Sequence, residues 1–126
     1  MCLIGQLETK KKTKTREEII GEQNDFFRKC PLNMGENVGK YLITSGVSGN
    51  GEGFAIAALN AVQKFDDFTN ENDPFGHHDF GSVEVEGEKV FWKIDLYDEN
   101  YEYGSEDPTN PKKTRRVLTI MLPQEY

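Results

Sequence analysis

The residues best suited to chemistry in this sequence lie in the segment DDFTNENDPFGHHDFG, residues 66–81. It holds both histidines of the chain, His77 and His78, and Asp79 follows them directly. Imidazole and carboxylate side chains together can bind a divalent transition metal or act as a general acid and base. The segment therefore presents His78, Asp79 and Asp73 as candidate catalytic residues, and His77, His78 and Asp79 as candidate metal ligands.

A structural interpretation of the same segment competes with these roles. Adjacent side chains tend to point apart, and the carboxylate spacing of an EF-hand calcium loop is absent. The residues Asp73-Pro74-Phe75-Gly76 fit a type I turn, with Asp first, Pro second and Gly fourth. Phe75 and Phe80 could then pack against Trp92. We expect the histidines to have a structural role rather than to bind a metal or act in catalysis, and we expect no cofactor.

Two helices are expected around this segment. Thr15 and Glu18 have the spacing of a capping box, which predicts a helix over Arg16–Lys29 that Pro31 ends. Apolar residues at three- and four-residue steps predict a second helix over residues 54–65.

The remaining pattern is that of strands. Residues 38–44 are rich in β-branched and aromatic types, and residues 83–97 alternate with a period of two around a tight turn at Glu86-Gly87. Residues 117–122 are apolar on both faces, as in a central strand. The order α-β-α-β-β-β predicts an α+β fold, a mostly antiparallel four-stranded sheet with both helices on one face.

A glycine-rich segment, SGVSGNGEG (residues 45–53), joins the first strand to the second helix, where phosphate-binding loops often lie. It lacks Gly-Lys-Ser/Thr, and Phe54 stands where a dinucleotide motif needs its third glycine. Glu52 would repel a phosphate. We expect a flexible connection rather than a nucleotide site.

Length and composition limit the function classes. The chain has 126 residues, enough for one domain, and we expect a flexible basic tail over residues 1–14 and a single domain over residues 15–126. The net charge of −7 argues against direct binding to nucleic acid. Cys2 and Cys30 fit no zinc or redox motif, and no signal peptide or membrane span is evident. Free thiols and a cytoplasmic location are expected.

Acidic residues concentrate in one part of the chain. Residues 66–107 hold fourteen acidic and two basic residues, a net charge of −12. Such a segment either solvates a surface or attracts a basic partner, and its carboxylates can imitate phosphates. The candidate partner-binding residues are Asp66, Asp67, Glu71, Glu84, Glu86, Glu88, Asp98, Glu99, Glu102, Glu106 and Asp107.

Several long strings resemble, in order and spacing, a bacterial family known only as domain of unknown function 3768. The resemblance covers roughly residues 22–126 and implies a small protein of plasmids, phages and other mobile elements, with no established activity. The family usually has an acid where this chain has His77, so the resemblance implies His78 and Asp79 as the matching positions. The strings are NDFFRK (24–29), FDDFTNENDPFGHHDFG (65–81), VFWKIDLYD (90–98), SEDPTNP (105–111) and RRVLTIMLPQEY (115–126).

Together these observations give two functional hypotheses. The first is a non-enzymatic binding protein that engages a basic protein surface through its acidic hairpin and residues 98–110. In a mobile-element setting, it would be a counter-defence inhibitor that blocks a host nucleic-acid-binding complex, as anti-CRISPR proteins do. The alternative is a metal-dependent hydrolase or nuclease that uses His78 and Asp79, with Asp73 nearby. Neither hypothesis involves a membrane.

Overall fold

The computed structural model describes residues 14–30 and 38–126. The basic tail expected over residues 1–14 lies outside these ranges except for Lys14, whose ammonium group pairs with the carboxylate of Glu22. Within the described residues, no helix is long and apolar enough to cross a membrane.

Helix α1 spans Arg16–Lys29, as the capping box predicts. The backbone amide of Glu18 donates to the hydroxyl of Thr15 at 3.1 Å, and the amide of Thr15 donates to the Glu18 carboxylate at 2.9 Å. Helix α3 spans Glu52–Lys64 and therefore starts two residues before the predicted apolar pattern. Gly51, which precedes it, has a φ of 105°, a backbone conformation that residues other than glycine rarely adopt.

The glycine-rich segment contains a short helix, α2 (Ser45–Ser48), where a flexible connection was expected. Its first turn is tied to the C-terminal end of the chain. The carboxylate of Glu125 accepts hydrogen bonds from the Thr44 hydroxyl at 2.6 Å and from the Gly46 amide at 2.9 Å. A carboxylate of the protein itself thus contacts a backbone amide that a phosphate-binding loop would offer to its ligand.

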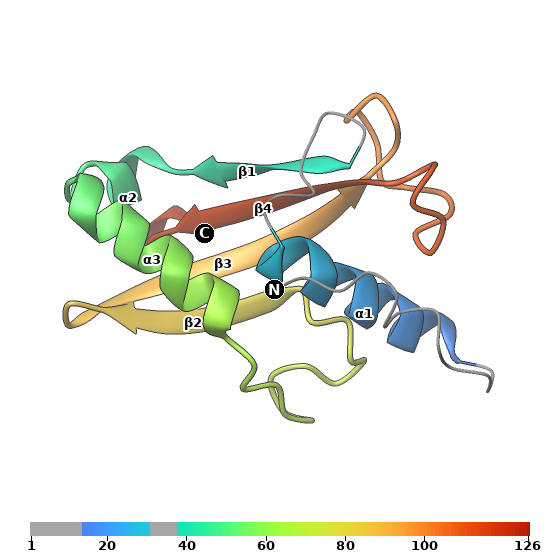
Figure 1. The fold of residues 1–126 in the computed structure, drawn as a ribbon, viewed down its shortest axis with the longest axis horizontal. Coiled ribbons are helices and arrows are strands. Elements are labelled where there is room, and N and C mark those ends of the chain that lie inside the picture. The colour runs from blue at the N-terminus through green and yellow to red at the C-terminus, as the bar shows by residue number, and fades with distance from the viewer. Residues whose placement is uncertain (1–13, 31–37) are drawn as a thin grey trace.

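Four strands form one sheet in the order β1-β4-β3-β2 (Figure 1). Strands β2 (Phe80–Val85), β3 (Glu88–Tyr97) and β4 (Arg115–Met121) pair antiparallel in succession. Strand β1 (Gly39–Ile43) lies parallel to β4 at the opposite edge. The prediction of a mostly antiparallel four-stranded sheet is confirmed, and the parallel pair makes the sheet mixed.

A tight turn joins β2 to β3, as the alternating pattern predicts. Glu86 and Gly87 both have positive φ angles, 52° and 82°. This is the combination of a type I′ turn, whose twist matches that of the two strands.

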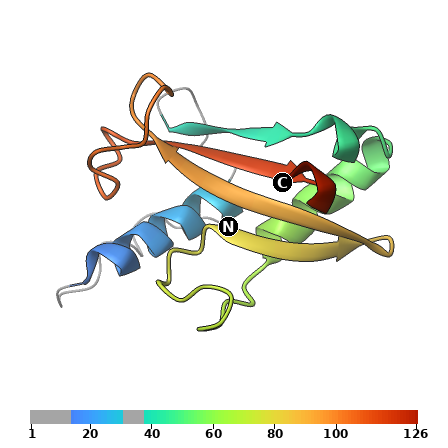
Figure 2. The ribbon, with the colours of Figure 1, turned by 180° about the vertical axis from the view of Figure 1, so that it is seen from behind.

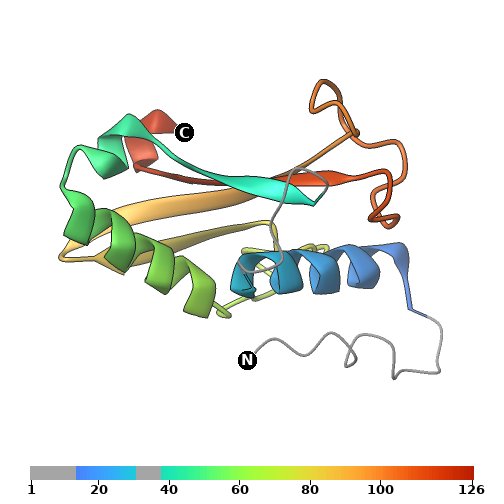
Figure 3. The ribbon, with the colours of Figure 1, turned by 45° about the horizontal axis from the view of Figure 1, so that its top comes forward.

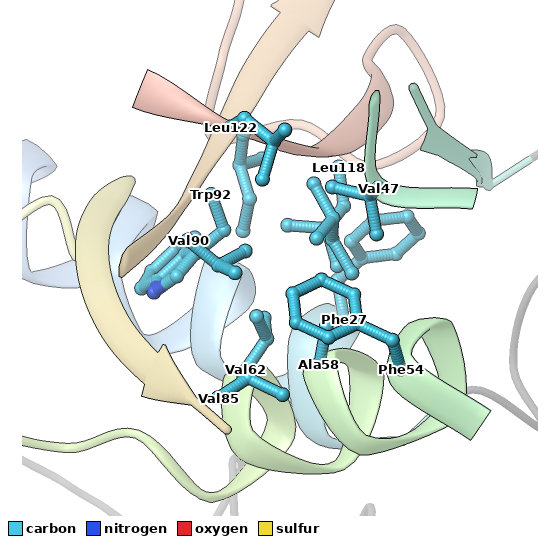
Figure 4. Packing of buried hydrophobic residues seen from close by; sticks show 12 residues of the cluster. Phe27, Val47, Phe54, Ala58, Val62, Val85, Val90, Trp92, Leu118 and Leu122 are labelled. Carbon is cyan, nitrogen blue, oxygen red and sulfur yellow. The ribbon is translucent and has the colours of Figure 1, made fainter. Parts of the chain in front are cut away.

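Helices α1 and α3 lie on the same face of the sheet (Figure 3), as expected. The core fills the space between them and the sheet, with Trp92 and Leu118 fully buried against Val62 of α3 (Figure 4). The C-terminal 3₁₀ helix η3 (Pro123–Glu125) lies on the other face (Figure 2). There the Tyr126 ring packs against the ring of Phe80, with centroids 5.6 Å apart.

The expectation of a free thiol is wrong for Cys30. This residue follows α1, is only 5% exposed and is disulfide-bonded. The described residues contain no free cysteine.

Candidate functional site

The His78 ring lies between two carboxylates. Its Nδ1 is 2.8 Å from an oxygen of Asp25, and its Nε2 is 3.5 Å from an oxygen of Asp73. An ionised carboxylate only accepts hydrogen bonds, so Nδ1 carries the proton that it shares with Asp25. Asp73 is therefore near His78, as the sequence suggested. Asp25 is a partner that the sequence did not reveal.

Asp25 is fixed by a buried cation on its own helix. The guanidinium of Arg28, whose side chain is fully buried, donates to the second oxygen of Asp25 at 2.9 Å. It also donates to the carbonyl oxygens of Val62 and Phe65, both at 2.7 Å. These carbonyls end α3, where few backbone donors remain to satisfy them. Arg28 therefore joins α1 to the end of α3 and holds the carboxylate that contacts His78.

Aromatic rings pack around His78 and Arg28, the two partners of the Asp25 carboxylate. The rings of Phe68 and His78 are parallel, with centroids 3.9 Å apart. The guanidinium carbon of Arg28 lies 5.5 Å from the Phe68 centroid and 4.9 Å from that of Trp92. Phe68 thus contacts both His78 and Arg28, and its stacking orients the imidazole of His78.

The backbone of His78 is itself in an unusual conformation. Its φ is 54°, in the left-handed region that costs a residue with a side chain about 1–2 kcal/mol. The Asp73 carboxylate accepts the His78 amide at 3.2 Å, and the Asn24 side chain donates to the carbonyl of His77 at 2.8 Å. These two hydrogen bonds hold the strained residue in place.

His77 has different neighbours. Its Nδ1 lies 4.0 Å from a carboxylate oxygen of Asp79, and its Nε2 is buried without a hydrogen-bond partner among the residues that the structure describes. Burial raises the pKa of the Asp79 carboxyl above its ordinary value of 3.8, an effect that the nearby His77 ring opposes. His77, His78 and Asp79 therefore do not face a common point. Over residues 14–30 and 38–126, no three His, Cys, Asp or Glu side chains are arranged to hold a metal ion.

An open pocket of about 440 Å³ lies between α1 and the segment that carries His78. One wall is formed by three carboxylates of α1, those of Glu18, Glu22 and Asp25, with the ammonium of Lys14 beside them. The other wall contains Gly76 and His78. An excess of carboxylates over cations favours a polar or cationic occupant over an anion.

The acidic residues proposed for partner binding lie in three separate places. Asp66, Asp67 and Glu71 follow α3, which ends at Lys64, before either aspartate. Glu84, Glu86 and Glu88 surround the β2–β3 turn, and the remaining five lie in the connection from β3 to β4. Strand β3 has ten residues, which separates the turn from that connection by about 30 Å (Figure 1). The structure does not bring the hairpin and residues 98–110 into one surface.

Three of the acids in the β3–β4 connection already have contacts within the protein. The Asp98 carboxylate accepts the amides of Asn100 and Glu102, both at 3.1 Å, and these hydrogen bonds help to lower its pKa from 3.8. Glu99 lies 3.9 Å from the guanidinium of Arg115. Asp107 is half-buried and accepts from the Thr109 hydroxyl at 3.5 Å. The hydrogen bonds of the Asp98 and Asp107 carboxylates therefore stabilise the conformation of the β3–β4 connection.

Sequence reasoning missed the part of the site that α1 contributes. Asn24, Asp25 and Arg28 lie within NDFFRK, one of the strings that carry the family resemblance, yet they were not candidates. A signal was present: Asn24 and Arg28 are one turn apart beside the apolar Phe27, and both are fully buried. A polar residue within the apolar face of a helix needs a hydrogen-bonding partner, and that requirement points to a network.

Comparison with known proteins supports the resemblance. The family model described as "Protein of unknown function (DUF3768)" matches residues 43–125. No curated protein and no solved structure matches the chain. The match covers most of the chain, including the His78 segment, the hairpin and β4, while α1 lies outside it. The chain is therefore a member of the DUF3768 family.

Proposed function

We propose that the protein is a non-enzymatic binding protein whose partner is a basic protein surface. The observation that carries the proposal is a set of eight exposed carboxylates that form no ion pair or side-chain hydrogen bond with described residues. They are Asp66, Asp67, Glu71, Glu84, Glu86, Glu88, Glu102 and Glu106.

The physical support is electrostatic. Carboxylates of like sign repel one another, and their uncompensated charge attracts a partner of opposite sign and raises its association rate. A basic partner would therefore gain from these groups without first breaking an ion pair inside the protein. Because the eight carboxylates lie in three separate places, each of the three groups is a separate candidate site of contact with the partner.

In the finer form of the proposal, the partner is a nucleic-acid-binding complex of a bacterial host. The protein would belong to a mobile element and act in counter-defence, as an inhibitor that works in the cytoplasm. Its support is chemical: a surface that binds phosphates through Lys and Arg also attracts suitably spaced carboxylates. Bound there, the protein would compete with nucleic acid.

Affinity capture from a bacterial lysate, at about 50 mM and about 500 mM salt, tests the proposal. The matched control carries Gln or Asn at all eight positions. We expect basic, nucleic-acid-binding proteins to be retained at low salt by the natural chain and not by the control, and to be released by added DNA. If the natural chain and the neutralised control retain the same proteins equally well, the proposal is refuted.

Hydrolysis at the pocket is the second candidate function, and one observation favours it. The Asp25–His78 pair lines the pocket, and a carboxylate on Nδ1 is the usual way to orient an imidazole that handles protons at Nε2. Asp79 has no part in this arrangement. The test is a screen of nuclease and esterase substrates, with and without divalent metals, comparing the natural chain with His78→Gln. An identical rate in the two proteins would eliminate the candidate.

A further inference from the structure

A large apolar side chain is exposed next to the His78 network. Phe75 is 70% exposed, at the tip of the turn from Asp73 to Gly76, which the Gly76 amide closes by donating to the Asp73 carbonyl at 3.1 Å. One face of its ring leans on His77, with centroids 5.9 Å apart. The alternative in which Phe75 packs into the core against Trp92 is therefore wrong. An exposed phenyl ring gains free energy only when a partner covers it.

The loop that presents Phe75, residues 66–79, is held by hydrogen bonds within itself and to α1. Within it, Thr69 and Asn72 exchange side-chain hydrogen bonds with each other's amides, at 2.9 and 3.2 Å. The amide of Asp73 also donates to the Thr69 carbonyl at 2.8 Å. At its end, His78 and Asn24 connect it to α1. A loop fixed in this way loses little conformational entropy when it binds, so more of the contact energy appears as affinity.

The loop that carries the exposed ring also carries negative charge. Asp66, Asp67 and Glu71 belong to the same loop and are among the eight carboxylates that form no ion pair with described residues. Gly76, which follows Phe75 directly, forms a wall of the pocket whose opposite wall contains the carboxylates of Glu18 and Glu22. A partner that contacts Phe75 and extends along the loop or over the neighbouring pocket therefore meets carboxylates.

We infer that residues 66–79 form a docking loop in which Phe75 is the anchor. Its partner is a protein surface with an apolar recess for the ring and Lys or Arg side chains around that recess. This inference rests on the proposed function, because it names which of the three acidic places contacts the basic partner. It assigns the contact to the loop before β2 and not to the β2–β3 turn or the β3–β4 connection.

The experiment uses the full chain and three synthetic peptides as probes. One alternates Arg with Leu, one alternates Arg with Ser, and one alternates Glu with Leu. Titration calorimetry measures the dissociation constants for the natural chain, for Phe75→Ala and for Tyr103→Ala. Tyr103 is the matched control because it is 74% exposed and lies in the β3–β4 connection. Neither ring is buried, so both variants are expected to fold, which circular dichroism verifies.

We expect the Arg/Leu peptide to bind most tightly, and Phe75→Ala to weaken it by about tenfold while Tyr103→Ala leaves it within about twofold. Amide shifts in the nuclear magnetic resonance spectrum should concentrate in residues 66–79. Equal weakening by both variants, or shifts at the β2–β3 turn instead, would overturn the docking loop and leave the proposed function intact. Absence of binding to both Arg-containing peptides would instead overturn the proposed function, and the docking loop with it.

Discussion

The imidazole Nδ1 of His78 lies 2.8 Å from a carboxylate oxygen of Asp25, although fifty-three positions separate the two residues in the chain. This contact joins α1 to the loop that leads into β2. Arg28 holds the other oxygen of the same carboxylate and, through two carbonyls, the end of α3. One carboxylate thus connects three parts of the fold.

Replacing His78 should separate the value of its contacts from the cost of its backbone conformation. His78→Ala removes the contact with Asp25 and the stacking on Phe68, and we expect the free energy of unfolding to fall by about 1–3 kcal/mol. His78→Gly removes the same contacts but relieves the left-handed strain, so it should be more stable than the Ala variant by about 1 kcal/mol. Urea denaturation measures both. An Ala variant as stable as the natural chain would show that the contacts contribute nothing net.

Arg28 should be far more sensitive than an exposed arginine of the same helix. Arg28→Ala removes the guanidinium that donates to two carbonyls at the end of α3 and to one oxygen of Asp25, and we expect a loss of about 3–5 kcal/mol. Arg28→Met keeps part of the packing against Trp92 and should lose less. Arg16→Ala, at an exposed position, should change stability by no more than about 0.5 kcal/mol. Thermal unfolding ranks the three, and similar midpoints for Arg28→Ala and Arg16→Ala would contradict the role of Arg28.

Two glycines in helices should respond to alanine with opposite signs. A Cβ at Gly21 would overlap the carbonyl oxygen of Gly76, so Gly21→Ala must displace the docking loop from α1. A Cβ at Gly53, in the first turn of α3, meets nothing within 4 Å. Gly53→Ala should therefore stabilise the protein by about 0.5–1 kcal/mol, whereas Gly21→Ala should destabilise it. Unfolding midpoints test the signs, and a stabilised Gly21→Ala would show that the helix and the loop separate at no cost.

Glu125 should make the protein sensitive to acid. Its carboxylate accepts the Thr44 hydroxyl and the amides of Leu122 and Gly46, and these bonds lower its pKa below the ordinary value of 4.5. A pKa lower in the folded than in the unfolded chain stabilises the fold above about pH 4.5, and that contribution disappears as the pH falls through the lowered value.

Melting temperatures of the natural chain and of Glu125→Gln, measured from about pH 7 to about pH 3, test this expectation. The variant should melt lower near neutral pH, and the difference should shrink in acid. Asp98→Asn is the control, because the pKa of Asp98 is also lowered but by amides in the β3–β4 connection. A constant difference between the Glu125 variant and the natural chain would mean that its carboxylate is not responsible.

The elements that local chemistry determines could be predicted from the sequence. The Thr15–Glu18 capping box placed the start of α1 correctly, and the positive φ angles at Glu86 and Gly87 are those of the predicted tight turn. In both cases the interacting groups are within a few residues of each other, so their spacing is visible in the sequence.

The contacts that link distant segments could not be predicted in this way. The parallel pairing of β1 with β4 joins strands more than seventy residues apart, and nothing in either strand indicates the direction of its neighbour. The link between Asp25 and His78 depends on the docking of α1 against the loop. The same holds for Phe75, whose apolar character suggested burial although the turn carries it outward.

The stretch of sequence that the family model matches is shorter than the set of elements that contact one another in the structure. The family model begins at residue 43, after α1 has ended, yet α1 contributes the buried Phe27 and Arg28. A fragment that starts at residue 43 would lack the donor for the α3 carbonyls and the acceptor for His78, and it would expose one part of the sheet. The boundary of the family match therefore leaves out buried contacts of the fold, and we expect a fragment truncated at that boundary to be less stable than the full chain.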